Sequence, residues 1–409
     1  MYFMYGPGGT GKTFLWSTII SKLRSEGKIV VAVASSGIAS LLLDGGRTAH
    51  SHFKIPIDMD EFSCCDNKQN TYLAELICNT SLVIWDKAPM HHRYIFEAVD
   101  HTFRDIRRDA QSLPFGGIPV LLCGDFRQTL PVVPKKGDGS EPTFLLGDDP
   151  DPSWIKIPDE VRVNHKGDAL EANINEIYGE LYHMHGDIEY LRDRAILTPL
   201  NEFVDSANNE VLKRLPRDFK VYKSCDGICK ASSSSIVDEA LYPPEYLNCL
   251  RFSGVPNHEI RIKAGAPIML FRNLNPKKGL CNGTRLIITW CYPFVIEALI
   301  ITGNKIGETT YIPRINMSPA DKTFPFLLKR KQFPVVVSYA MTINKSQCQT
   351  VKNVGLYLPK PFFSHGHFYV AVSRVTSPKG LKITCVDRDT TYVGHTKNIV
   401  CREIFDNIM

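Results

Sequence analysis

The sequence predicts an α/β fold with two parallel sheets, one in each of two domains, and a small β-rich insert in the second domain. Strand-like and helix-like patterns alternate through residues 1–135, which is typical of a parallel sheet covered by helices on both faces. A second such series, interrupted by a β-rich stretch, follows a segment rich in Gly, Asp and Pro. At 409 residues, the chain is also too long for one compact core.

The first domain is assigned to residues 1–137. Its apolar runs are short enough for buried strands, and its longer amphipathic runs fit helices. The expected strands are 1–5, 29–35, 82–86 and 118–125, and the expected helices are 12–27, 37–43 and 94–108.

Residues 138–158 are interpreted as a linker and 159–409 as the second domain, with the β-rich insert at about 285–335. Helical patterns cover 169–183 and 201–215, and the polar, low-complexity segment 224–239 is expected to be an exposed loop. Further strands are expected at 333–340, 354–358 and 381–386. The chain shows no internal repeat of fixed period.

Composition narrows the class of protein. A net charge of +5 permits nucleic-acid binding without requiring it, and no apolar run approaches the ~20 residues that span a membrane. The first residues do not read as a signal peptide, so the 12 cysteines are expected to be reduced thiols in a nuclear or cytosolic protein. Cys225 and Cys229 have no second Cys/His pair at zinc spacing, so we expect no zinc.

Residues 6–13, GPGGTGKT, match the phosphate-binding pattern G-x-x-x-x-G-K-[ST] between an expected strand and an expected helix. Glycines let the backbone N–H groups curl around phosphates, Lys12 would reach the β and γ phosphates, and the Thr13 hydroxyl would bind magnesium. The alternative is a chance Gly-rich turn. The sequence therefore predicts ATP or GTP binding by Gly6, Gly8, Gly9, Thr10, Gly11, Lys12 and Thr13.

Two polar residues follow later strands of the first domain. Asp86 ends the strand-like run LVIWD and is interpreted as a magnesium ligand, the alternative being an ordinary aspartate at the end of a strand. Gln128 follows the run that ends at Asp125 and could sense a γ-phosphate, although polar residues after a strand are common.

Several longer motifs occur in a characteristic order: GPGGTGKTFLW, TAHSHFKIPI, WDKAPM, GGIPVLLCGDFRQTLPVVP, GAPIMLFRNLNPKKGLCNGTRL, AMTINKSQCQT and HGHFYVAVSRV. In these motifs and their order, the chain resembles the PIF family of superfamily-one DNA helicases, and the resemblance extends from Gly6 to about Val386. Within that family, it is most similar to the helicase region of plant Helitron transposons.

This resemblance implies two RecA-like domains, ATP with magnesium between them, and single-stranded DNA as the partner. It implies 5′-to-3′ unwinding in recombination, repair of DNA damage and telomere maintenance, by a monomer in the nucleus or the mitochondrion. It also implies that Gln128 senses the γ-phosphate and that Arg374 is an arginine finger. The residues placed near DNA are Thr48, Ser51, Phe53, Lys345, Ser346 and Gln347. A basic run, 328–332, could contact phosphates or be a solvated face.

The chain departs from the family pattern at several points. Lys87 replaces the glutamate that polarises the attacking water, and Lys87 could pair with Asp86 or with a phosphate. An arginine-bearing block is missing near 147–154, and an upstream element that reads adenine is expected to be absent. Cys348 stands at a glycine position, where a positive φ would strain the turn.

These departures leave two hypotheses open. Loss of a general base costs ~10²–10⁴ in rate and loss of an arginine finger about 10³–10⁵, so one alternative is a degenerate copy that binds ATP and single-stranded DNA without hydrolysis or unwinding. The other is an active PIF-type helicase. A third, an unrelated nucleotide enzyme such as a small-molecule kinase, does not account for the motifs after residue 260.

Overall fold

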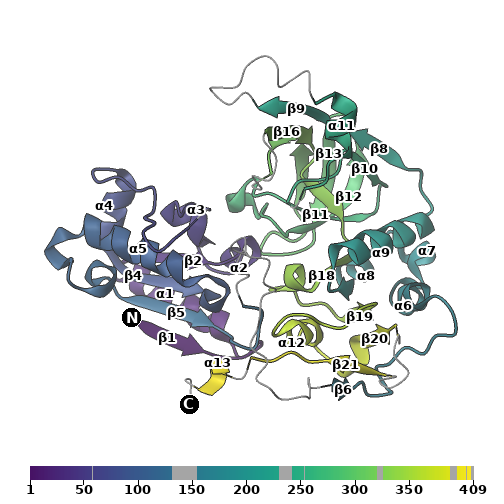
Figure 1. Ribbon diagram of the computed structural model, residues 1–409, viewed down its shortest axis with the longest axis horizontal. Coiled ribbons are helices and arrows are strands. Elements are labelled where there is room, and N and C mark those ends of the chain that lie inside the picture. Colours follow the sequence, from purple (N-terminus) through teal and green to yellow (C-terminus); the bar gives the residue numbers. More distant parts are fainter. Residues whose placement is uncertain are drawn as a thin grey trace. The chain divides into compact units, whose positions relative to one another are not determined.

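The computed structural model describes residues 1–57, 59–130, 154–229, 242–252, 254–319, 326–386, 394–401 and 403–406 (Figure 1). The chain divides into two compact units. Unit 1 comprises Met1–Ile157, Lys360–Ser373 and Asp387–Met409, and unit 2 comprises Pro158–Pro359 and Arg374–Val386. Within the described residues, no helix is long and apolar enough to cross a membrane.

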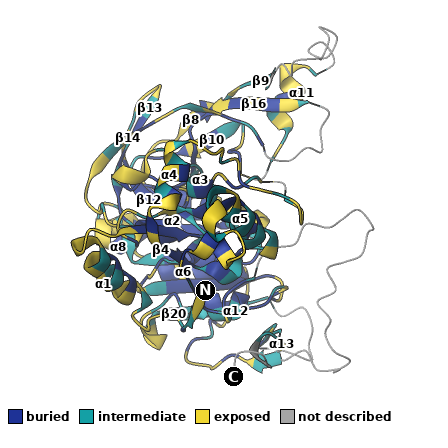
Figure 2. Cartoon of the chain, turned by 90° about the vertical axis from the view of Figure 1, so that its left-hand side faces the viewer, coloured by how far each residue is buried: buried dark blue, intermediate teal, exposed yellow. Residues whose placement is uncertain are grey.

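Unit 1 contains a five-stranded parallel sheet with the strand order β1-β5-β4-β2-β3. Its strands are β1 (Tyr2–Tyr5), β2 (Ile29–Ala34), β3 (Arg47–Thr48), β4 (Thr80–Asp86) and β5 (Val120–Gly124). Strand β4 is largely buried, as its dark blue colour in Figure 2 shows, because a central strand of a covered parallel sheet meets apolar neighbours on both faces. The strands predicted for the first domain are all present.

Helices pack around this sheet and supply an aromatic core. Phe53 packs at 5.7 Å from the ring of Trp85 and 5.4 Å from that of Phe103, all three in the apolar core of unit 1. The helices are α1 (Lys12–Ser25), α2 (Gly37–Leu41), α3 (Ala49–Phe53), α4 (Tyr72–Cys78) and α5 (Arg93–Ile106), with the 3-10 helices η1 (Ala88–Met90), η2 (Arg108–Ala110) and η3 (Pro114–Gly117).

Two later segments of the chain belong to unit 1, although the sequence analysis assigned them to the second domain. One contains α12 (His367–Val372), and the other contains β21 (His395–Lys397) and α13 (Glu403–Asp406). Strand β21 pairs antiparallel with β6 (Trp154–Lys156). The pattern of apolar and polar residues along the chain indicates local secondary structure only. It therefore does not reveal that these segments pack with the first unit. Most of the predicted linker, residues 138–158, lies outside the described residues.

Unit 2 contains a parallel sheet with the strand order β18-β7-β19-β20. Tyr178 and Tyr339 lie fully buried in its core with ring centroids 5.3 Å apart. The strands are β7 (Arg194–Thr198), β18 (Ala340–Thr342), β19 (Asn353–Leu358) and β20 (Leu381–Cys385). The helices are α6 (Ala169–Tyr178), α7 (Leu181–Met184), α8 (Ile188–Arg192) and α9 (Asn201–Arg214), with the 3-10 helices η5 (Ile343–Ser346) and η6 (Pro378–Gly380).

The β-rich part of unit 2 begins well before residue 285. Its main sheet, in the order β14-β13-β12-β11-β17, is antiparallel, and the smaller sheets are β10-β8 and β15-β16-β9. The elements are β8 (Lys220–Lys223), β9 (Cys225–Cys229), α11 (Pro244–Cys249), β10 (Glu259–Ile262), β11 (Pro267–Leu270), η4 (Pro276–Lys278), β12 (Arg285–Cys291), β13 (Val295–Ile300), β14 (Thr309–Pro313), β15 (Ile315–Met317), β16 (Leu327–Gln332) and β17 (Val335–Val337).

One segment predicted to be an exposed loop is in part a strand. Strand β9 lies inside 224–239 and pairs antiparallel with β16, the strand that contains the basic run 328–332. The alternation of side chains along β16 turns Arg330 inward, where it is 0% exposed, while Lys329 and Lys331 face outward. The basic run is therefore neither a continuous phosphate contact nor a fully solvated face.

The buried charge of Arg330 is matched by Asp226 on β9. The Arg330 Nη2 atom donates to Asp226 Oδ2 at 2.7 Å, and the Arg330 Nε atom donates to Asp226 Oδ1 at 3.0 Å. Both side chains are 0% exposed. The remaining N–H groups donate to the carbonyl oxygens of Leu247, Leu250 and Pro256. This single pair therefore joins β16, β9 and the segment around α11.

Removing one member of this pair should leave an unpaired buried charge. We expect Asp226→Ala to lower the free energy of unfolding of unit 2 by about 3–5 kcal/mol, measured by urea denaturation. Replacing both residues by apolar ones, Asp226→Leu with Arg330→Met, should cost clearly less, because no charge then stays buried. A double variant as unstable as Asp226→Ala would contradict this account.

Candidate nucleotide-binding site

Three strand ends of unit 1 converge on the predicted phosphate loop. Strand β5 lies between β1 and β4, so the loop after β1, Asp125 after β5 and Asp86 at the end of β4 share one edge of the sheet. In parallel α/β sheets, the carboxyl edge of the strands is where ligands bind. The fold thus brings together the loop and two carboxylates that the sequence places far apart.

The loop has the backbone that a phosphate cradle requires. Gly9 and Gly11 both have a φ of +79°, a conformation that side chains with a Cβ disfavour. The loop leads directly into the 14-residue helix α1, whose first N–H groups and dipole favour an anion. Thr10 is tied within the loop, because its hydroxyl donates to the Pro7 carbonyl at 2.9 Å.

Lys12 and Thr13 occupy the first turn of α1. The Lys12 ammonium lies over the loop and donates to the carbonyl oxygens of Gly6 and Pro7. Thr13 is exposed there. One ammonium group, several backbone N–H groups and a hydroxyl form a donor set that suits a triphosphate with its magnesium. Among the described residues, no group of three or more His, Cys, Asp or Glu could hold a metal by itself.

Asp86 is 6% exposed and has a thiol as its neighbour on β5. Burial, reinforced by the negative charge of Asp86, raises the pKa of Cys123 to about 12, so this thiol stays protonated. A carboxylate is a ligand that magnesium accepts. Asp86 lies at the end of β4, and its role as a magnesium ligand stays a prediction.

Lys87 turns the chain sharply after β4. Its φ is +60°, and its carbonyl oxygen accepts from the Ser35 hydroxyl at 2.6 Å. The Lys87 ammonium donates to Gln128 Oε1 at 2.8 Å. The described contacts therefore pair Lys87 with Gln128 and not with Asp86, while pairing with a phosphate stays a prediction.

Gln128 is held at both ends of its amide. Its Oε1 atom accepts from Lys87, and its Nε2 atom donates to Asp125 Oδ2 at 3.0 Å. Lysine can only donate and a carboxylate can only accept, so the amide has one orientation. Gln128 is 3% exposed, and it would have to give up one of these hydrogen bonds to reach a γ-phosphate.

Tyr369 of α12 completes this network, and the sequence analysis did not single it out. Its hydroxyl donates to Asp125 Oδ2 at 3.0 Å and accepts from the backbone N–H of Gly8 at 3.2 Å. The motif YVAVSRV, which also contains Arg374, includes this tyrosine, but Tyr369 contacts residues more than 240 positions away in the chain. No pattern along the chain could have paired them.

Arg374 belongs to unit 2, where the residue is 7% exposed. Its Nη1 atom donates to the carbonyl oxygens of Ser346 and Gln349 at 3.4 and 3.5 Å. The arginine expected to act as a finger is thus packed against the segment TINKSQCQT. Cys348 in that segment has a φ of +63°, which confirms that the glycine position requires a left-handed conformation.

The residues predicted to lie near DNA differ in exposure. Ser346 and Gln347 are buried, and the half-buried Lys345 ammonium lies 4.3 Å from the centre of the Phe271 ring. Burial lowers the pKa of Lys345. In unit 1, Ser51 is exposed and Thr48 precedes α3, whereas Phe53 is a core residue whose ring has no surface to offer a base.

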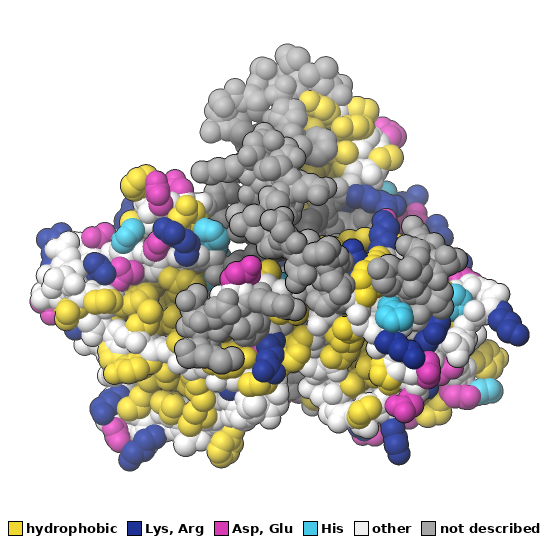
Figure 3. Space-filling model, turned by 60° about the horizontal axis from the view of Figure 1, so that its bottom comes forward, with side chains coloured by type: hydrophobic (Ala, Val, Ile, Leu, Met, Phe, Trp, Pro, Cys, Tyr) yellow, Lys and Arg dark blue, Asp and Glu magenta, His cyan; other side chains and the backbone are white. Residues whose placement is uncertain are grey.

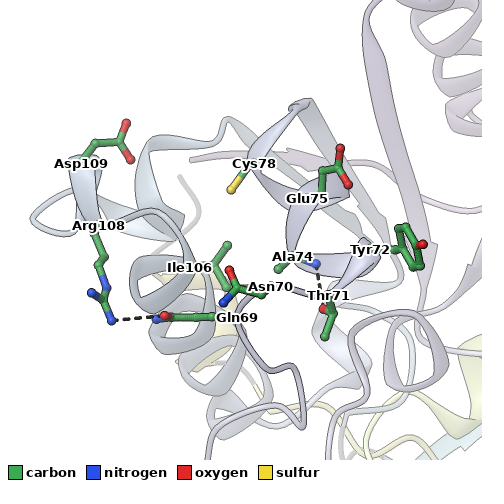
Figure 4. Close-up of a pocket in the computed structure, with 10 residues that line it drawn as sticks. All are labelled: Gln69, Asn70, Thr71, Tyr72, Ala74, Glu75, Cys78, Ile106, Arg108 and Asp109. Atoms are coloured by element: carbon green, nitrogen blue, oxygen red, sulfur yellow. Dashed lines mark hydrogen bonds between the residues drawn. The ribbon is translucent and has the colours of Figure 1, made fainter.

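A separate cavity of about 1050 Å³ lies beside α4 and near η2, and Figure 4 shows its lining. Arg108 donates to Gln69 Oε1 at 3.2 Å across one side of it. It is lined by Gln69, Asn70, Thr71, Tyr72, Ala74, Glu75, Cys78, Ile106, Arg108 and Asp109. None of these residues belongs to the predicted site, and the nucleotide loop is therefore not part of this cavity.

Two family models match the chain. The PIF1-like helicase model matches residues 1–148, and the model of the 2B domain of DNA helicase Pif1 matches residues 245–290, within the β-rich part. The ATP-dependent DNA helicase Pif1 of Campylobacter jejuni is 28% identical over 93% of this chain and 88% of its own length. Human ATP-dependent DNA helicase PIF1 is 27% identical over 94% of this chain, which spans only 58% of the human protein.

A solved structure of Pif1 helicase from Bacteroides, in complex with ADP-AlF3 and single-stranded DNA, has a similar fold. The TM-score is 0.63 with 22% sequence identity, over 99% of this chain and 92% of that one. This likeness supports the predicted fold, two RecA-like domains with a β-rich insert. The matches confirm the resemblance to the PIF family, while the closeness to plant Helitron helicases stays a prediction.

His91, a buried histidine that accepts a hydrogen bond from Trp85, should make unit 1 sensitive to acid. Burial, together with the neighbouring His50, lowers the pKa of His91 from 6.5 to about 3. As pH falls below 6.5, the unfolded chain takes up a proton that folded His91 does not. Stability should therefore fall between pH 6.5 and about 3, by at most about 1.4 kcal/mol per pH unit from this group.

Urea denaturation followed by tryptophan fluorescence at pH 7.5 and 5.5 measures this effect, because Trp85 donates to His91 Nδ1 at 3.2 Å. His91→Gln keeps an acceptor for Trp85 and should reduce the loss of stability at pH 5.5. His183→Gln, which removes an exposed histidine, is the matched control. An unchanged pH dependence in His91→Gln would assign the effect elsewhere.

Proposed function

We propose that this chain, by its likeness to PIF-family helicases, is by descent an ATP-dependent DNA helicase that binds ATP on the loop of residues 6–13 and single-stranded DNA. The observation that carries this proposal is the glycine loop between β1 and α1, with Lys12 above it and Asp86 and Asp125 at adjacent strand ends. That arrangement binds a nucleoside triphosphate and gives it a magnesium partner.

Each group of the loop has a defined task in this proposal. The backbone N–H groups and the Lys12 ammonium neutralise the phosphates, and Thr13 with Asp86 would hold magnesium, which neutralises charge that develops on the phosphate oxygens. Gln128 sits beside these groups and would respond to the γ-phosphate. The direction of travel, 5′ to 3′, and the roles in recombination, repair and telomere maintenance are further parts of the proposal, supported by the family resemblance.

We also propose that the protein acts as a monomer in the nucleus or the mitochondrion. The basic side chains of the protein would contact DNA in small, separate groups. On the face seen in Figure 3, described Lys and Arg side chains lie in small groups among acidic and apolar ones, and they form no continuous basic surface there.

A second candidate function is a degenerate copy that binds ATP and single-stranded DNA but does not hydrolyse or unwind. The contact of Lys87 with Gln128 favours it, because an ammonium replaces the carboxylate that would activate water and also occupies the sensor amide. Such a loss of a general base costs about 10²–10⁴ in rate. The arginine-bearing block expected near 147–154 falls largely outside the described residues. We favour this candidate for the activity of the present chain.

Steady-state ATP hydrolysis with and without single-stranded DNA separates the two candidates. We expect turnover close to that of Lys12→Ala, which removes the phosphate-binding ammonium and sets the background. Lys87→Glu should raise the rate by less than about tenfold, because one restored group does not replace the others that act with it. DNA-stimulated turnover of several per second by the unaltered chain would contradict the degenerate reading.

Binding of single-stranded DNA should survive in either case and should weaken with salt. The slope of log affinity against log salt is about −0.7 for each phosphate contact, so Lys345→Gln should reduce the slope by about 0.7. Lys22→Gln alters an exposed lysine paired with Glu26 on α1 and serves as the control. If fluorescence anisotropy detects no binding even at low salt, the nucleic-acid function itself is wrong.

A further inference from the structure

The phosphate loop of unit 1 is already in contact with a side chain from the returning segment 360–373. The backbone N–H of Gly8 donates to the Tyr369 hydroxyl at 3.2 Å. That hydroxyl in turn donates to Asp125 Oδ2 at 3.0 Å, so it bridges the loop and the end of β5. An N–H group of this loop is one that a phosphate oxygen would otherwise accept from.

Neighbouring contacts fix Tyr369 in this place. Gly366, just before α12, has a φ of +72°, and a Cβ there would lie 2.4 Å from the Arg127 carbonyl oxygen, so the turn is seated directly on the backbone after β5. His365 adds a second attachment. Its Nε2 atom lies 2.7 Å from the Phe126 carbonyl oxygen, while its Nδ1 atom accepts from the Cys401 N–H. These contacts hold the backbone just before α12 against the segment after β5, which places the Tyr369 side chain beside the phosphate loop.

The carboxylate of Asp125 connects this bridge to Gln128. Its Oδ2 atom accepts from both Tyr369 and Gln128, and its Oδ1 atom accepts from the Arg127 N–H at 3.1 Å. Two donors that share one oxygen form a single network, so the strength of one hydrogen bond depends on the other. A change at Tyr369 is thereby felt by the amide of Gln128.

We propose that Tyr369 is a positioning residue whose hydroxyl competes with the nucleotide for the Gly8 N–H and is displaced when phosphate binds. This inference rests on the proposed function of the loop. A phosphate oxygen carries a charge and is a stronger acceptor than a phenol, so it wins the N–H once nucleotide is present. The displaced hydroxyl releases its hold on the loop and keeps only Asp125 as its partner.

Tyr369→Phe tests this competition, because it removes the hydroxyl and keeps the ring. Without the competitor, ADP and inorganic tripolyphosphate should bind about fivefold more tightly by calorimetry, the value of one ordinary hydrogen bond. The melting temperature without ligand should fall, because the bridge to Asp125 is lost. A merely structural role would lower both stability and affinity, so the opposite signs identify the competition.

Tyr5→Phe is the matched control. Tyr5 lies on β1, the strand that enters the loop, and its ring is 6.1 Å from the Phe126 ring. It makes no described contact with Gly8. It should leave both affinities within about twofold of the unaltered chain. Equal or weaker binding by Tyr369→Phe, with normal binding by the unaltered chain, overturns the competition alone. Failure of the unaltered chain to bind ADP overturns the proposed function instead.

Discussion

The predicted site depends on the hydrogen bonds that the carboxylate of Asp125 accepts. This carboxylate accepts from the Arg127 N–H, from the side-chain amide of Gln128 and from the Tyr369 hydroxyl, which in turn contacts the phosphate loop. At 3% exposure the carboxylate has little contact with water, and these three donors satisfy its oxygens instead. The phosphate loop, the end of β5 and helix α12 are therefore all connected through this one carboxyl group.

Much of the fold could be predicted from local pattern, because buried parallel strands and amphipathic helices leave strong signals. The phosphate loop, Asp86 and Gln128 were found in this way. The contacts between them were not, since Lys87 pairs with Gln128 and Tyr369 with Asp125 across long stretches of chain. Strand β9 was missed for a similar reason: its inward residue is Asp226, whose partner Arg330 lies in a run that reads as uniformly basic.

Two residues of the motifs take backbone conformations that their side chains disfavour. Lys87 and Cys348 have φ values of +60° and +63°, and a left-handed non-glycine residue costs about 1–2 kcal/mol. Surrounding contacts must stabilise them, as the Ser35 hydroxyl does for the Lys87 carbonyl. Both lie beside groups expected to handle nucleotide or DNA, so the local strain coincides with the predicted function and with the departures from the family pattern.

The assignment of 360–373 and 387–409 to unit 1 has a consequence for the covalent connectivity of the molecule. The chain passes between the units after Ile157, Pro359, Ser373 and Val386. Tyr369 and Arg374 therefore stand on either side of one passage, five positions apart in sequence but in different units. Unit 2 is formed by two separate stretches, and no single continuous fragment contains all of it without part of unit 1. A protease cut at one passage would leave the units joined by the others.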